Sequence, residues 1–179
     1  MSQDRTENRG VTIRPLLQGE IAVVERNLPF DSASAGRYYE YFTLQNFGEA
    51  VDLIAWHSGL PVGHALLRWR GTRTEPIASQ LKDCPHISSL HVHPDCRSQG
   101  IGSLLLDRAE ELALDRGYHQ VGLSVDVANV RAQALYERRG YRDAGFAPCR
   151  RQWSFLDRTG RAQSCEEICL YLIKPLIPR

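Results

Sequence analysis

The chain has 179 residues, of which 42% are hydrophobic and 24% are charged, and its formal net charge is +1. This length is enough to bury one substantial core, and the balanced charge gives no reason to expect a nucleic acid or an anionic membrane as partner. No apolar run approaches the roughly 18 to 20 residues of a membrane-spanning helix. Segment 1–10 is polar and lacks the apolar stretch of a signal peptide. We therefore expect a disordered lead-in over 1–10 and one domain over 11–179.

Five cysteines cannot all pair within one chain, and none of them forms a Cys-x-x-Cys motif. Reduced thiols in a cytoplasmic protein are the expected state. Cys165 and Cys169 lie close in sequence but have no histidine beside them, so we expect no metal site.

The first half of the chain alternates short apolar runs with longer mixed segments. Hydrophobic periodicity and turn residues divide it into structural elements. The predicted elements are a strand over 11–14, helices over 16–27 and 33–47, strands over 50–56 and 61–70, and a polar loop over 71–85.

The second half begins with a strand over 87–92, which His93 and Pro94 end because proline donates no hydrogen bond to a sheet. Apolar residues then recur at helical spacing up to Gly117. The predicted elements that follow are a helix over 100–116, a strand over 120–127, a helix over 129–139, and a final pair of strands over 146–155 and 167–173. This order predicts a mixed α/β layer fold.

The segment Arg97-Ser98-Gln99-Gly100-Ile101-Gly102-Ser103 lies where the strand over 87–92 gives way to the helix. The first turn of a helix offers unpaired backbone N–H groups and the positive end of the helix dipole. Glycines let a large anion approach this backbone closely, and Arg97 adds a permanent charge. The segment therefore predicts a cradle for a phosphate or pyrophosphate.

Two other phosphate-binding motifs fit this segment badly. A P-loop requires a lysine and then a serine or threonine after its last glycine, whereas Gly102 is followed by Ser103 and Leu104. A dinucleotide-binding fingerprint requires a third glycine at the position that Leu105 occupies.

A second motif begins about thirty residues later, after the strand over 120–127. Asn129 is placed to cap the following helix, because the side-chain oxygen of an asparagine satisfies an unpaired helix donor. The motif consists of Asn129, Ala132, Tyr136, Gly140 and Tyr141.

Together the two motifs, in this order and spacing, resemble the GNAT superfamily of acyl-CoA-dependent N-acetyltransferases. The resemblance is sharp from Leu90 to Tyr141. It implies a mostly antiparallel sheet of about seven strands flanked by helices and split between strands 87–92 and 120–127 to admit acyl-CoA. It also implies acetyl-CoA as cosubstrate. The residues that would bind it are Leu90, His91, Val92, Arg97, Ser98, Gln99, Gly100, Ile101, Gly102, Ser103, Asn129, Ala132 and Tyr136.

The chemistry implied by the resemblance is direct attack of an amine on a thioester. An amine with a pKa near 10 must lose a proton first, and the departing thiolate benefits from a general acid. Tyr136 matches the tyrosine that serves as this acid in the family. The alternative is that Tyr136 is an aromatic residue packed on the inner face of its helix.

The general base is where this sequence departs from common family members. The positions that often carry a glutamate hold Ser88 or Ser89 on one strand and Ser124 on the other. A histidine titrates in the useful range, which makes His86 or His91 the leading candidate for the base. His64, Asp126 or a water chain without a dedicated base are the alternatives.

Acceptor specificity is expected from segments outside these motifs. Glu40, between Tyr38 and Tyr41, could hold a cationic amine, and arginines of the terminal hairpin, Arg151 among them, could hold a carboxylate. The alternative is that the tyrosines are core residues and the arginines a solvated face. The acceptor could be a peptide N-terminus or a small polycationic amine, and the protein a monomer or a homodimer. A non-catalytic acyl-CoA sensor is the competing function.

Overall fold

The structure is a computed structural model that describes residues 10–29, 36–156 and 161–177, with the side chains of 153–156 left out of the description. The lead-in expected over 1–10 lies outside the described residues, apart from Gly10.

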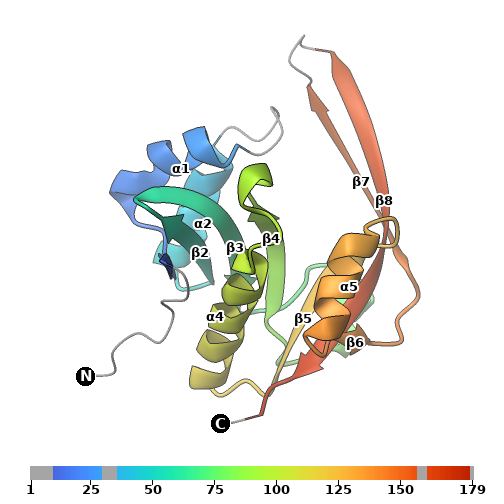
Figure 1. The fold of residues 1–179 in the computed structure, drawn as a ribbon. Coiled ribbons are helices and arrows are strands. Elements are labelled where there is room, and N and C mark those ends of the chain that lie inside the picture. The colour runs from blue at the N-terminus through green and yellow to red at the C-terminus, as the bar shows by residue number, and fades with distance from the viewer. Residues whose placement is uncertain (1–9, 30–35, 157–160, 178–179) are drawn as a thin grey trace.

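The strands of the described residues form one sheet in the order β1-β2-β3-β4-β5-β8-β6, with β7 also paired to β8 (Figure 1). Neighbouring strands are antiparallel except for β4 and β5, which are parallel. The strands are β1 (Val11–Pro15), β2 (Ala50–His57), β3 (Leu60–Arg68), β4 (His86–Val92), β5 (Gln120–Asp126), β6 (Arg142–Asp143), β7 (Cys149–Leu156) and β8 (Ala162–Pro175).

Helices cover both faces of this sheet. They are α1 (Ile21–Asn27), α2 (Arg37–Asn46), α3 (Ile77–Gln80), α4 (Ile101–Asp115) and α5 (Val130–Arg138), with short 3-10 turns at Gln18–Glu20 and Pro94–Cys96. None of the described helices is long and apolar enough to cross a bilayer.

Alternation along the strands separates the two layers. On β2, Leu53 packs into the core cluster that contains α4, whereas Ile54 packs into the cluster of α1. On β3, Leu67 joins the α4 cluster, whereas Leu66 packs against Tyr41 of α2. Because successive strand residues point to opposite faces, α4 lies on one face of the sheet and α1 with α2 on the other.

The parallel pairing of β4 with β5 is short. Only His86 with Gly122 and Ile87 with Leu123 are partners, although each strand has 7 residues. Beyond Ile87 the edge of β4 that faces β5 has no strand partner, and Figure 1 shows the two strands diverging. The predicted split between these strands is therefore confirmed.

A β-bulge interrupts β4 just beyond this point. The register with β3 shifts between His64 and Leu66, and Ser89 has a φ of 54°, in the left-handed region that side chains rarely adopt. A bulge adds one residue to a strand and turns its direction. Here it redirects the part of β4 that follows Ser89.

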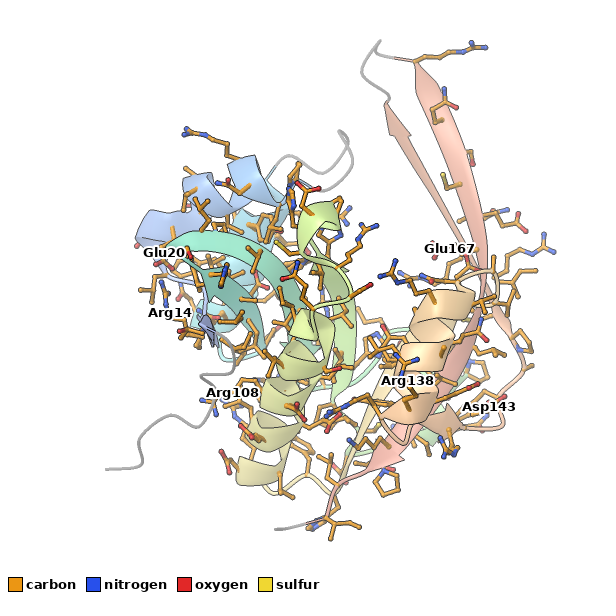
Figure 2. All side chains as sticks on the ribbon, in the orientation of Figure 1. Arg14, Glu20, Arg108, Arg138, Asp143 and Glu167 are labelled. Atoms are coloured by element: carbon orange, nitrogen blue, oxygen red, sulfur yellow. The ribbon has the colours of Figure 1, made fainter. Side chains whose placement is uncertain are left out.

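Ionic contacts on the α4 face join the two halves of the split sheet. Glu110 of α4 bonds Lys174 of β8 and accepts a hydrogen bond of 3.0 Å from the Tyr141 hydroxyl. Arg139, just after α5, forms ion pairs with Asp107 and Glu110. These side chains connect α4 with α5 and β8, and so stabilise the relative position of the halves. A separate ion pair, between Arg14 and Glu20, lies at the β1 end of the sheet (Figure 2).

The fold class predicted from the sequence is confirmed, whereas several elements differ from their predicted ranges; the helix expected over 16–27, for example, is a 3-10 turn followed by α1. The two-residue strand β6 is too short to give a sequence pattern and brings the described strands to eight. The loop expected over 71–85 contains the single turn α3. The last strand, expected over 167–173, runs from Ala162 to Pro175, because its first half pairs only with β7 and has no buried face to impose alternation.

Gly122 lies beneath the ring of Tyr171, and a Cβ at this position would overlap that ring. We predict that Gly122→Ala lowers the free energy of unfolding by about 1–3 kcal/mol, as overpacking does in other cores, measured by urea denaturation. Gly19→Ala is the control, since nothing lies within 4 Å of the position that its Cβ would occupy. Equal stability of the two variants would contradict this packing.

Candidate functional site

A pocket of about 630 Å³ opens where β4, the first turn of α4 and helix α5 meet. It is lined by residues of three segments that are far apart in sequence. These are Leu90, His91, Val92, Cys96, Arg97, Ser98, Gly100, Ile101, Gly102, Ser103, Asn129, Arg131, Ala132, Leu135, Tyr136 and Arg138.

The residues proposed from the sequence to bind acetyl-CoA all line this pocket except Gln99. The Gln99 side chain instead donates a hydrogen bond of 3.1 Å to the carbonyl of Asp95. Sequence reasoning missed four lining residues, Cys96, Arg131, Leu135 and Arg138. Helical spacing offered a signal, since Arg131, Leu135 and Arg138 are four and three residues apart, which places them on one face of α5.

The turn before α4 exposes the start of the helix. Gly100 precedes α4 with a φ of 86°, and nothing lies within 4 Å of the position its Cβ would occupy. The backbone therefore enters the helix without a side chain over the first N–H groups, which have no acceptor within the helix. The Arg97 side chain is held at the pocket by a hydrogen bond of 3.1 Å from its Nε to the carbonyl of Val92.

The pocket is cationic. Arg97, Arg131 and Arg138 line it, and no aspartate or glutamate is among the described residues that line it. Arg131 donates a hydrogen bond of 2.7 Å to the Ser98 hydroxyl, which ties α5 to the turn before α4. Guanidinium groups and the N-terminus of a helix are both suited to phosphate oxygens. The residues present therefore fit the pyrophosphate of a CoA thioester.

Asn129 caps α5 as expected. Its Oδ1 accepts a hydrogen bond of 3.1 Å from the backbone N–H of Ala132. This cap fixes where the helix begins, and so fixes which of its side chains, Ala132 and Tyr136 among them, reach the pocket.

Tyr136 is 7% exposed and lies at the inner wall of the pocket, with its ring edge-on to Tyr141 at 5.8 Å. Burial raises the pKa of Tyr136 to about 12, so the phenol keeps its proton at neutral pH. Its hydroxyl has no hydrogen-bond partner among the described residues. The side chain thus both packs against the core and presents a protonated hydroxyl to the pocket.

The two candidate histidines of β4 differ in their surroundings. His91 lines the pocket, but His86 is buried at the closed end of the split, 3.3 Å from the Tyr171 hydroxyl. Burial, with smaller contributions from Arg151 and Arg68, lowers the pKa of His86 to about 3. His86 is therefore neutral across the physiological range, and it is not among the described residues that line the pocket. Of the two, His91 is the one in a position to meet a ligand.

The other candidate bases lie elsewhere. His64 is completely buried on β3, where its Nδ1 is 3.2 Å from Asp52, and burial raises the pKa of that aspartate. Asp126 accepts a hydrogen bond of 3.0 Å from the backbone N–H of Ala128 and shapes the turn before α5.

The residues expected to bind the acceptor are divided by the structure. Tyr38 is a core residue whose hydroxyl donates a hydrogen bond of 2.9 Å to the carbonyl of Leu28, so its side chain is closed to a ligand. Tyr41 is also buried, but its hydroxyl lies 2.8 Å from that of Ser89 at the bulge. Glu40 is exposed on α2, and Arg151 is exposed on β7.

The sequence of this chain matches those of acetyltransferases. A model of the acetyltransferase (GNAT) family matches residues 21–141. Thialysine N-epsilon-acetyltransferase from Bos taurus is 40% identical over 58 residues, which cover 32% of this chain and 34% of that protein. Mycothiol acetyltransferase from Clavibacter sepedonicus is 44% identical over 55 residues, covering 31% and 18%.

The fold is similar over most of the chain to solved structures. A GNAT family acetyltransferase from Elizabethkingia anophelis, solved with acetyl-CoA bound, has a TM-score of 0.61 at 16% identity, and the match covers 94% of this chain and 100% of that one. At this identity the likeness shows the fold alone.

Gly102 tests the assignment of the pocket. A Cβ here would lie 3.5 Å from Leu135 Cδ2, an ordinary contact, so Gly102→Ala should fold normally and bind CoA with at most a small loss. Gly102→Asp adds a negative charge where the pyrophosphate would lie. We predict that it weakens CoA binding at least tenfold, about 1.4 kcal/mol or more, in titration calorimetry. If Gly102→Asp binds CoA with wild-type affinity, the turn before α4 is not part of the CoA-binding site.

Proposed function

Because the chain belongs to the acetyltransferase (GNAT) family, we propose that it transfers an acetyl group from acetyl-CoA to a primary amine in a ternary complex. The observation that carries this proposal is the pocket formed where β4 and β5 separate beside the start of α4. The pocket brings a cationic cradle, an unpaired strand edge and a protonated tyrosine to one place.

The binding step follows from these parts. The N–H groups at the start of α4 and the guanidinium of Arg97 would hold the pyrophosphate. The pantetheine arm would lie along the edge of β4 that β5 leaves unpaired, where backbone groups at Leu90 and Val92 can replace the missing strand. One of these N–H groups would also polarise the thioester carbonyl and stabilise the oxyanion that forms there.

In the chemical step, the nitrogen of a neutral amine attacks the carbonyl carbon of the thioester. A C–N bond forms, and the nitrogen, now positively charged, gives up one proton. The tetrahedral oxyanion then collapses, and the C–S bond breaks to release the CoA thiolate and leave a neutral amide. Tyr136 supports this step because its phenol is protonated at neutral pH and can give its proton to the departing sulfur. A phenolate left behind would regain a proton from solvent through the open pocket.

Among the described residues that line the pocket, His91 is our candidate acceptor for the proton that the amine must lose. A neutral imidazole accepts a proton in the range where most enzymes work. By resemblance to the family, serine occupies the positions where a carboxylate is common, at Ser88 or Ser89 on β4 and at Ser124 on β5, and a serine hydroxyl is no base at neutral pH.

This absence of a carboxylate is what favours the second candidate function, an acyl-CoA-binding module without catalysis. Thiol release from acetyl-CoA, measured against a panel of amines, separates the two. Amine-dependent release supports the transferase, whereas CoA binding without release for any amine supports the sensor. A protein that does not bind CoA would exclude both.

Tyr136→Phe keeps the ring and its packing but removes the hydroxyl. We expect kcat to fall roughly 10- to 1,000-fold, with acetyl-CoA affinity and stability little changed, since only the proton donor is lost. Tyr141→Phe is the matched control, because its hydroxyl bonds Glu110 and lies outside the pocket. If the chemical step limits turnover and Tyr136→Phe has the same kcat as wild type, Tyr136 has only a packing role.

The pH dependence separates the histidines. If His91 accepts the proton, kcat/KM rises with pH as its imidazole becomes neutral, and the pH profile has an acidic limb. His91→Gln should remove this limb and lower the rate. His86→Gln should retain it, because the pKa of His86, about 3, lies below the range measured. A rate that rises log-linearly to pH 9 in wild type and both variants would exclude a histidine base.

A further inference from the structure

A row of side chains crosses the sheet on the face away from α4, at the closed end of the split. Arg68 is the register partner of His86, and His86 is the partner of Gly122. Paired residues of neighbouring strands point to the same face, and Ile87, the next residue, points into the α4 core. Tyr171 lies over Gly122 and stacks on His86 with ring centroids 5.6 Å apart. We call this row the floor, since it lies beside the closed end of the split on the face of the sheet opposite α4.

Arg151 belongs to the same face. It pairs in register with Glu167 of β8, which alternates with Cys169 and Tyr171 on one side of that strand. Arg151 and Arg68 both lie close enough to His86 to help lower its pKa. The row is therefore flanked by a guanidinium from β3 and another from β7.

Neither guanidinium forms an ion pair within the described part of the chain. The neighbouring residue, Arg150, does form an ion pair. It points to the opposite face of β7, where its guanidinium lies 3.0 Å from the carboxylate of Glu166. Arg68 is half-buried. A partly buried guanidinium without a carboxylate is suited to receive one from a ligand, in the planar two-bond geometry that guanidinium and carboxylate share.

Carboxylates are also present on this face. Glu167, labelled in Figure 2, pairs in register with Arg151, and Asp126 pairs in register with Cys169. The floor thus carries both signs of charge, as an acceptor with an amine and a carboxylate requires. A polycationic amine would leave both arginines without a partner and place like charges together.

We propose that the acceptor is an amine that also carries a carboxylate, and that Arg151, with Arg68 beside it, binds that carboxylate on the face of the sheet opposite α4. This inference rests on the proposed acetyl transfer and narrows its substrate to amino-acid-like molecules. It assigns to Arg151 a role in specificity rather than in the chemical step.

The test compares amines that differ only in the anionic group. L-Phenylalanine is assayed beside L-phenylalaninamide and 2-phenylethylamine, and L-lysine beside L-lysinamide and cadaverine, by thiol release from acetyl-CoA. Dipeptides with free and amidated C-termini test whether the carboxylate of a peptide serves as well as that of a free amino acid. We expect kcat/KM to be at least tenfold higher for the carboxylate member in at least one set.

Two variants test whether Arg151 is responsible for the preference for carboxylate substrates. Arg151→Met should reduce this preference at least tenfold, through a higher KM for the carboxylate substrate, while the rate with its amide changes little. Arg150→Met, one residue away and ion-paired on the other face, should keep the wild-type preference. A preference that survives Arg151→Met, or falls equally in both variants, would overturn the assignment.

Calorimetry with acetyl-CoA separates this inference from the proposed function. Acetylation of amides and decarboxylated amines as fast as of the acids would overturn the inference and leave the transferase. Acetyl-CoA binding without transfer to any member of the panel would overturn both.

Discussion

The early end of the β4–β5 pairing is the constraint on which the site depends. Two parallel residue pairs hold these strands together, and then the strands part. Each strand remains paired on its other side, β4 with β3, and β5 with seven residues of β8. The sheet can therefore carry an unpaired internal edge without losing its core. Ionic contacts of Glu110 and Arg139 hold α4 against α5 and β8, so the two halves stay in fixed relation.

This arrangement gives the sheet two chemically different sides at the same point. On one side the start of α4, Arg97 and the inner face of α5 form a cationic pocket. On the other lie the row from Arg68 to Tyr171 and the helix α2. The bulge at Ser89 links them, because the hydroxyl of Tyr41 on α2 lies within hydrogen-bond distance of Ser89 while the next residue of β4 lines the pocket. Packing on the α2 side can thus fix the strand edge that would hold the thioester.

The sequence predicted the parts of the fold and site that local chemistry determines. Some features depend only on residues within one or two helical turns, and these could be predicted. They are the turn Arg97–Gly102, the cap by Asn129 and the spacing of Ala132 and Tyr136. Features that depend on packing between segments far apart in the sequence could not be predicted. His86 could be named as a candidate base, but its burial under Tyr171 comes from a strand far along the chain. The length of β8 was underestimated because an isolated hairpin has no buried face to mark it.

Hydrogen exchange with and without acetyl-CoA tests the central claim, that the split and the adjacent helix start form the binding site. We expect slower exchange of the backbone amides at 90–92 and 98–104 when acetyl-CoA is added, with no change at 116–120, beyond the far end of α4. Protection confined to other parts of the chain, or no protection of these two segments at saturating acetyl-CoA, would contradict it.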